Sequence, residues 1–188
     1  MKQIGFLITA ILLLNTTIAQ QKQKENKPVR FLAGIALEFG GDQVAEVLFE
    51  DGSTQGMNAG QGGTVFAGGQ FRLNQKETFF LRASAGIKYV TTKADNAHIR
   101  LTRFPLQLTV NYVPVKKMRL AAGVVTHQAI RLNFDGLGDN TKFTSSPGLV
   151  MEVGYGVFGL SYTLMTYQNP SQESFRANAI GLTVSGVF

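Results

Sequence analysis

The chain has 188 residues, a formal net charge of +6, 44% hydrophobic residues, 16% charged residues and no cysteine. This length suits one domain, and the apolar content is too high for a disordered chain. The lack of cysteine excludes a disulfide framework and thiolate-bound zinc or iron–sulfur clusters. Composition and charge identify no specific biochemical activity.

The first 19 residues have the layout of a secretory signal peptide. Lys2 supplies a positive charge, and residues 4–14 form an apolar run that is shorter than the roughly 20 residues a transmembrane helix needs. Thr17 and Ala19 then place small residues before a cleavage site. A buried N-terminal helix is the alternative. We predict a signal peptide over residues 1–19 that is removed on export.

The rest of the chain divides into a leader and one domain. Residues 20–29 are polar and charged, which predicts a disordered leader in front of a domain over 30–188. No run of about 18 apolar residues follows, and helical spacing is weak, so no membrane helix is predicted. Apolar residues instead recur at every second position, the side-chain period of a β-strand. Eight segments share this period: 30–40, 64–73, 78–91, 97–113, 118–132, 147–156, 158–168 and 174–188.

The connections between these segments differ in length. Residues 41–63 and 133–146 form long loops, and we leave open whether 41–63 contains an extra hairpin. Residues 74–77 and 114–117 form tight turns, as does the stretch near Gly156. Short turns at one end and long loops at the other are typical of outer-membrane barrels, which must close to pair every backbone group in lipid. We therefore predict an all-β fold, an antiparallel up-and-down transmembrane β-barrel of about eight strands.

The segment 97–113 illustrates the two faces of the predicted strands. Its inner face carries polar Gln107, Thr109 and Asn111. A soluble barrel that carries a small ligand, such as a lipocalin, would have the reverse arrangement, and alternation alone does not decide between them. The proposed outer face carries the large apolar residues Phe104, Leu106, Leu108, Val110 and Tyr112.

Further details of the strands refine this prediction. Phe66 and Phe80 fall on the inner face. A bulge within 100–103 is needed if Leu101 and Phe104 are to share the outer side. Four tyrosines near strand ends favour an aromatic girdle at the membrane boundary: Tyr89, Tyr112, Tyr155 and Tyr167.

The C-terminal segment carries a family resemblance. The chain ends at Phe188, and Leu182 and Val184 share one face of the last predicted strand. A terminal aromatic residue preceded by apolar residues at every second position resembles the signal read by the outer-membrane assembly machinery. With the signal peptide and the loop asymmetry, nearly the whole mature chain resembles small eight-stranded barrels of the OmpA/OmpX-like superfamily, as a distinct group within it.

The resemblance implies location and partners. It implies the outer membrane of a Gram-negative bacterium, with membrane lipid, lipopolysaccharide and the assembly machinery that reads the strand ending at Phe188 as partners. It implies no particular activity, because the superfamily contains structural, adhesive and evasion proteins as well as enzymes. We expect a monomer without nucleic-acid partners, cofactor or metal.

The inner face of the predicted barrel carries an excess of positive charge. An eight-stranded interior is filled by side chains, so unpaired charges in it are costly. We expect ion pairs between the acidic and basic groups, with water between them. The alternative is an anion site at the outer mouth, for lipopolysaccharide phosphates or a small acidic ligand. The charged residues of this face are Arg72, Arg82, Lys88, Arg103, Arg119, Arg131, Glu38 and Glu152.

His127 and Glu152 are weak candidates for hydrolase chemistry. Some lipid A deacylases on this fold use a histidine, a serine two residues later and a glutamate, but Ala129 offers no nucleophile here. We therefore predict a non-enzymatic role, structural or in surface interaction, without an open pore. A lipid-modifying enzyme on the same barrel and a narrow channel are the alternatives.

Overall fold

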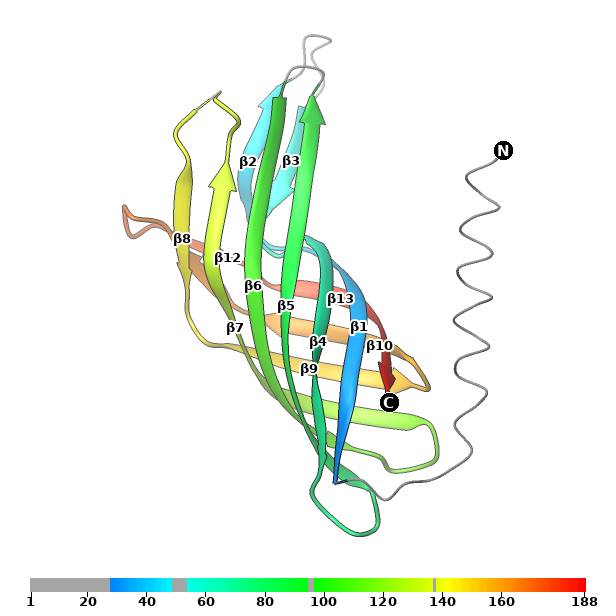
Figure 1. The fold of residues 1–188 in the computed structure, drawn as a ribbon. Helices are drawn as coiled ribbons and strands as arrows, with labels where there is room; N and C mark the ends of the chain where they lie inside the picture. Colours follow the sequence, from blue (N-terminus) through cyan, green and yellow to red (C-terminus); the bar gives the residue numbers. More distant parts are fainter. Residues whose placement is uncertain (1–27, 49–53, 95–96, 137) are drawn as a thin grey trace, which may run out of the picture.

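A closed barrel forms the body of the protein. The computed structural model describes residues 28–48, 54–94, 97–136 and 138–188, and the regular elements within these ranges are all β-strands. Eight of these strands are antiparallel to their neighbours in chain order, and β13 pairs with β1 to close the ring (Figure 1). The predicted all-β up-and-down barrel is therefore confirmed. Its strands are β1 (Val29–Phe39), β4 (Gly62–Arg72), β5 (Phe79–Ala94), β6 (Ala97–Tyr112), β7 (Met118–Asn133), β9 (Gly148–Tyr155), β10 (Phe158–Leu164) and β13 (Ala179–Val187).

The predicted N-terminal segments fall largely outside this description. The signal peptide over 1–19 lies outside the described residues, as does the leader over 20–29 up to residue 27. Val29 already belongs to β1, so the described strand begins one residue before the predicted domain. No helix in the described ranges is long and apolar enough to span a bilayer.

Short strands extend one end of the barrel. β2 and β3 form the hairpin that the sequence left open within 41–63, and β8 continues the sheet beside the upper part of β7. The segments predicted as continuous over 158–168 and 174–188 are interrupted, because β11 and β12 leave the barrel and pair with β8 and with each other. These strands are β2 (Gln43–Leu48), β3 (Thr54–Asn58), β8 (Thr141–Ser145), β11 (Thr166–Gln168) and β12 (Ser174–Arg176).

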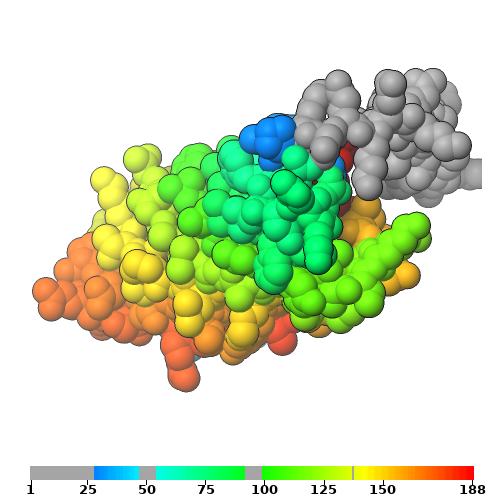
Figure 2. Space-filling model, turned by 90° about the horizontal axis from the view of Figure 1, so that it is seen from below, coloured from blue at the N-terminus to red at the C-terminus, as the bar shows by residue number. Residues whose placement is uncertain are grey.

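The two ends of the barrel differ as the sequence predicts. Tight connections join β4 to β5, β6 to β7 and β9 to β10 at the end where β1 begins and β13 finishes, which we call the turn end (Figure 1). Figure 2 shows the molecule from below, with the β6–β7 turn projecting in bright green. The Asn74 side chain orders the first turn by accepting the backbone N–H of Thr78 at 3.0 Å. The opposite end, the loop end, carries the longer connections and the short strands.

Apolar side chains cover the outside of the barrel. Large residues such as Val65 and Leu182 are 66% and 60% exposed, whereas the interior side chains of Lys88 and Arg103 are 1% and 0% exposed. Phe80 lies inside, as predicted. This distribution is the reverse of a lipocalin-type barrel, because the oily face points outward. We call the following outward side chains the apolar band: Phe31, Ile35, Leu37, Val65, Phe71, Phe79, Ile87, Tyr89, Phe104, Leu106, Leu108, Val110, Tyr112, Leu120, Val124, Leu149, Met151, Val153, Leu160, Tyr162, Ile180, Leu182 and Val184.

β7 contains a bulge. The prediction of a bulge within 100–103 of β6 is wrong. Thr102 pairs with Arg131 while Phe104 pairs with Gln128, so β7 carries one extra residue at this point. Ala129 has a φ of 48° there. Because a bulge reverses which face later residues occupy, Arg131 points outward, contrary to the prediction that it lies on the inner face.

The position of Leu101 follows from the same correction. β6 alternates without interruption, so Leu101 is fully buried while Phe104 is 42% exposed on the opposite side. Leu101 belongs to an apolar core that fills the loop end, where the long strands extend past the barrel and pack against one another. Tyr167 is also 0% exposed in this core, so its predicted place in an outer girdle is wrong. The core contains Met57, Ala59, Ile99, Leu101, Val125, Ile130, Leu132, Phe143, Val150, Met165, Tyr167 and Ala177.

The bulge provides a test of this register. A left-handed backbone costs an L-residue about 1–2 kcal/mol, and a β-branched side chain tolerates it least. We expect Ala129→Val to lower the free energy of unfolding by about 1 kcal/mol or more, and Ala129→Gly to leave it unchanged or slightly higher. Urea unfolding from neutral lipid vesicles measures both variants. A valine variant as stable as the parent would contradict the bulge.

Candidate functional site

The charges inside the barrel form three separate groups along its axis. The first group lies at the turn end, where Glu77 of the β4–β5 turn receives Arg30 at 3.1 Å and Arg72 at 3.5 Å. Arg72 therefore takes part in a bridge between β1, β4 and the turn. Glu77 and Arg30 were not among the interior charges predicted from the sequence. Alternation does not predict the direction of a side chain in a turn or at the end of a strand.

The second group lies in the middle of the barrel. Arg119 of β7 donates a hydrogen bond to the carboxylate of Glu152 on neighbouring β9. Glycine makes room for this pair, because a Cβ at Gly154 would lie 2.8 Å from Arg119 and one at Gly159 would lie 2.6 Å from Glu152. Arg82 of β5 donates from Nε to the side-chain oxygen of a residue on β4, Gln70, at 2.7 Å. The ion pairing expected from the sequence is present here.

The third group lies just below the loop end. Lys88 of β5 is 3.0 Å from the carboxylate of Glu38 on β1, which also accepts a hydrogen bond from Thr64 at 3.1 Å. Lys88 is opposite Arg103 of β6 in the sheet, and two like charges in such positions repel. The carboxylate and a set of backbone carbonyls offset this repulsion.

Those carbonyls belong to residues 59–61, which we call the plug. Arg103 donates to the carbonyls of Ala59 and Gln61, and Lys88 donates to that of Gly60 at 2.7 Å. Ala59 and both cations are almost completely buried. The plug therefore covers the inner charges at the loop end and stabilises them with carbonyl dipoles.

Neighbouring loops hold the plug in place. Gly60 N–H donates to the carbonyl of Gly40 at 3.0 Å, and Ala59 N–H donates to that of Asp42 at 2.8 Å. Asp42 N–H in turn donates to the carbonyl of Arg176 at 2.7 Å. A Cβ at Gly60 would lie 2.4 Å from the carbonyl oxygen of Asn178, so glycine permits this close approach of backbones.

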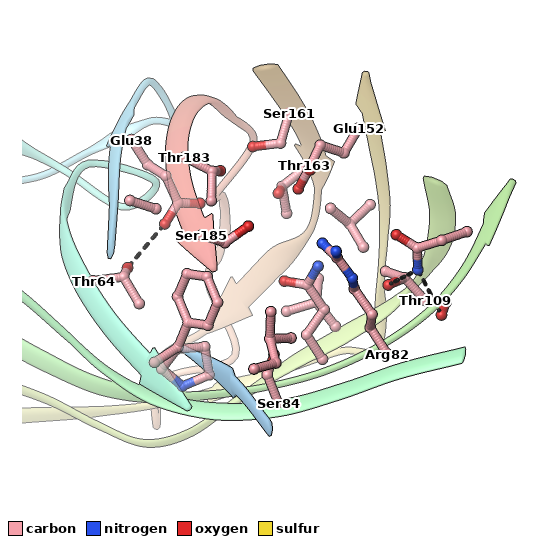
Figure 3. Close-up of a pocket in the computed structure, with 18 of the residues that line it drawn as sticks. Glu38, Thr64, Arg82, Ser84, Thr109, Glu152, Ser161, Thr163, Thr183 and Ser185 are labelled. Carbon is pink, nitrogen blue, oxygen red and sulfur yellow. Dashed lines mark hydrogen bonds between the residues drawn. The ribbon is translucent and has the colours of Figure 1, made fainter. Parts of the chain in front are cut away.

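A small polar cavity lies beneath the plug. Its volume of about 70 Å³ is well above the roughly 10–15 Å³ that one water needs, so it has room for a few waters, and it is far below the several hundred Å³ of a drug-sized pocket. Hydroxyl groups converge on it from several strands (Figure 3). The buried Oγ of Ser185 and Oδ1 of Asn111 have no hydrogen-bond partner among the described residues. The hydroxyl lining comprises Thr64, Ser84, Thr109, Ser161, Thr163, Thr183 and Ser185.

The two weak catalytic candidates both line this cavity but have different partners. The Nδ1 atom of His127 is hydrogen-bonded to the hydroxyl of Tyr167, whereas Glu152 pairs with Arg119. Burial raises the pKa of Tyr167, which lies in β11 beyond the barrel strands. Arg103 also donates to that hydroxyl at 3.4 Å, so Tyr167 links His127 to the third group of charges.

One serine, Ser145, is hydrogen-bonded to the backbone of His127. Ser145 Oγ accepts the N–H of His127 at 3.0 Å and donates to its carbonyl at 3.1 Å. Activation of a serine nucleophile requires its hydroxyl within hydrogen-bond reach of the basic ring nitrogen. The hydrogen bonds of Ser145 go to the backbone of His127 and not to its ring, so they anchor β8 to β7. Among the described residues, no three His, Asp or Glu side chains gather as a potential metal site.

The sequence was compared with protein-family models and with curated proteins. No protein-family model matches the chain, and no curated protein matches it. These two comparisons therefore assign the chain to no family. The closed eight-stranded antiparallel barrel is shown by the structure itself.

The buried and exposed arginines provide one test of the site. Arg103→Met leaves buried carbonyls of the plug without charged donors, so we expect the free energy of unfolding to fall by about 2–3 kcal/mol. Arg131→Met changes an exposed side chain and is expected to alter it by no more than about 0.5 kcal/mol. Urea unfolding from neutral vesicles compares them. Equal effects would show that the two arginines share an environment.

The middle ion pair provides a second test. Glu152→Leu leaves Arg119 buried without its counter-charge, for which we expect a loss of about 3–5 kcal/mol in unfolding free energy. Adding Arg119→Leu is expected to restore most of the loss, because apolar replacement of a whole buried pair is often neutral. A double variant no more stable than the single one would contradict this coupling.

Proposed function

We propose that the protein is an integral β-barrel of the outer membrane of a Gram-negative bacterium, with a structural or surface-interaction role and no open pore. The observation that carries the proposal is the apolar band around a barrel whose buried interior contains ion pairs. Soluble monomers rarely expose contiguous apolar patches beyond a few hundred Å². Lipid is the solvent in which this surface is stable.

The extent of the apolar band supports a bilayer. On β6 the outward positions from Phe104 to Tyr112 are apolar or aromatic, a stretch suited to the roughly 9–11 residues of a spanning strand. The exposed cations lie beyond it, with Arg100 toward the loop end and Lys117 in the turn at the other end. The rings of Phe79 and Tyr112 stack at 4.9 Å near the turn-end limit of the band.

The partners in this proposal are membrane lipid, lipopolysaccharide and the outer-membrane assembly machinery. β13 is the strand that closes the barrel against β1, and its extension reaches Phe188. The backbone N–H of Phe188 donates to the carbonyl of Phe31 at 2.9 Å, and the reverse bond is 3.0 Å. A strand that completes the ring suits recognition by machinery that assembles barrels. We propose a monomer that belongs with OmpA/OmpX-like barrels.

The loop end suits a role in contact and not in transport. In support of this, the plug covers the inner cations, an apolar core packs at the same end, and the cavity has room for only a few waters. The extended strands and the β2–β3 hairpin present surface beyond the apolar band (Figure 1). We propose that this surface is the interacting part and that the protein acts without enzymatic chemistry or a cofactor.

Cell fractionation and bilayer recording test the proposal together. We expect the protein in the outer-membrane fraction, migrating differently on a gel before and after boiling, because folded barrels resist detergent. In planar bilayers we expect no steady conductance. A soluble periplasmic protein would contradict the membrane location, and steady single-channel currents would contradict the closed interior. Altered acylation of lipid A in overproducing cells would contradict the non-enzymatic role.

A further inference from the structure

A group of cations lies on the outside of the barrel just beyond the apolar band. The β7 bulge turns Arg131 outward, where its neighbour on β8 is Lys142 and its neighbour on β6 is Thr102. Arg100 lies two residues from Thr102 on the same face of β6. Arg100, Arg131 and Lys142 are all exposed, and we call them the basic triad.

The basic triad lacks acidic partners within the described part of the chain. The ion pairs found there use Arg30 and Arg72 with Glu77, Lys88 with Glu38, Arg119 with Glu152, and Arg176 with Asp42. Arg131 and Lys142 are direct cross-strand partners, and like charges in such positions destabilise a sheet. An external anion bound between them would remove that cost.

The surface next to the basic triad changes polarity in steps. Below Arg131 on β7 come Gln128 and Thr126, whose side chains are joined by a hydrogen bond of 2.8 Å. Val124 follows in the apolar band. Along this face the side chains are therefore first cationic, then neutral and polar, then apolar. This order matches the phosphate headgroup, the linkage region and the acyl chains of a lipid.

A shallow depression continues this surface into the apolar band. It reaches Thr126 at its upper side and runs over β4, β5, β6 and β7. Small residues form its floor and larger ones its walls, so an extended hydrocarbon chain fits along it. Alanines 67, 83 and 85 contribute to the floor, and Leu106, Leu108 and Val124 stand beside them.

We infer that this face binds a lipid whose headgroup carries two phosphate groups, with the phosphates on the basic triad and an acyl chain in the depression. The inference rests on the proposed membrane location. Arginine binds phosphate through two parallel hydrogen bonds, so Arg131 and Arg100 supply geometry as well as charge. Three cations together match two phosphates better than the single charge of an ordinary phosphodiester lipid.

The site differs from the anion site considered from the sequence. That site was expected at the outer mouth from inner-face cations, and two of these, Lys88 and Arg103, are buried and bound to Glu38 and the plug. Arg131 is available on the outer surface only because the bulge removes it from the interior.

Native mass spectrometry of the folded protein in neutral detergent tests the inference. The probes are diphosphoryl lipid A, the same lipid without phosphates, and phosphatidylglycerol. We expect diphosphoryl lipid A to bind at least about tenfold more tightly than either of the others, since each exposed cation near an anionic lipid contributes roughly fivefold.

Matched variants assign the effect to the basic triad. Arg131→Gln with Lys142→Gln is expected to weaken diphosphoryl lipid A binding about 20-fold. Lys116→Gln with Lys117→Gln removes the same charge from the exposed turn end and is expected to leave binding unchanged. Equal binding by both double variants, or no preference for the diphosphoryl lipid, would overturn the inference.

The outcome is separable from that of the proposed function. A protein that inserts into neutral phosphatidylcholine vesicles and shifts on heating, yet shows no phosphate preference, retains the proposed function and loses this inference. Failure to insert into any vesicle would overturn the proposed function itself. Exposed substitutions seldom change stability by more than about 0.5 kcal/mol, so both double variants are expected to fold.

Discussion

Closure of one sheet is the constraint on which the rest of the structure depends. Once β1 pairs with β13 on one side and β4 on the other, the barrel has no free edge, and the backbone groups of its strands find partners within the sheet. Closure with eight strands also fixes a narrow interior. Most large apolar side chains then lie outside, and polar side chains that point inward must satisfy one another.

The narrow interior explains how the charges are arranged. Buried cations are tolerated because each group brings its acceptors: Glu77 at the turn end, Glu152 in the middle, and Glu38 with the plug near the loop end. The plug is the least expected of these acceptors, because its backbone carbonyls accept hydrogen bonds from the cationic side chains of β5 and β6. The same contacts fix the loops, so the stability of the interior and the shape of the loop end depend on one set of interactions.

Much of the barrel was predictable because its signals are local. Period-two alternation located the first six barrel strands to within about three residues, and loop length predicted which end carries the turns. The inward direction of Phe80 and the pairing of interior charges also followed from strand parity and the cost of burying a lone charge.

The remaining features depend on contacts between distant segments. A single extra residue at Ala129 reverses which side chains of the rest of β7 point inward and which point outward. No residue type at this position predicts such a bulge, so Arg131 was assigned to the wrong face. Leu101 and Tyr167 were assigned to the outside because apolar residues there suit lipid, but beyond the barrel they pack into a core between loops. The carbonyls of 59–61 have no side-chain signature at all.

The central claim, that the apolar band contacts lipid, is tested most directly by quenching of single fluorescent labels. The chain lacks cysteine, so Leu108→Cys in the apolar band and Lys116→Cys at the turn end each give one labelling site. In vesicles we expect acyl-chain-bound quenchers to quench the label at 108 and aqueous iodide to quench the label at 116. Iodide quenching at 108 with no effect of the lipid-bound quencher would contradict the account.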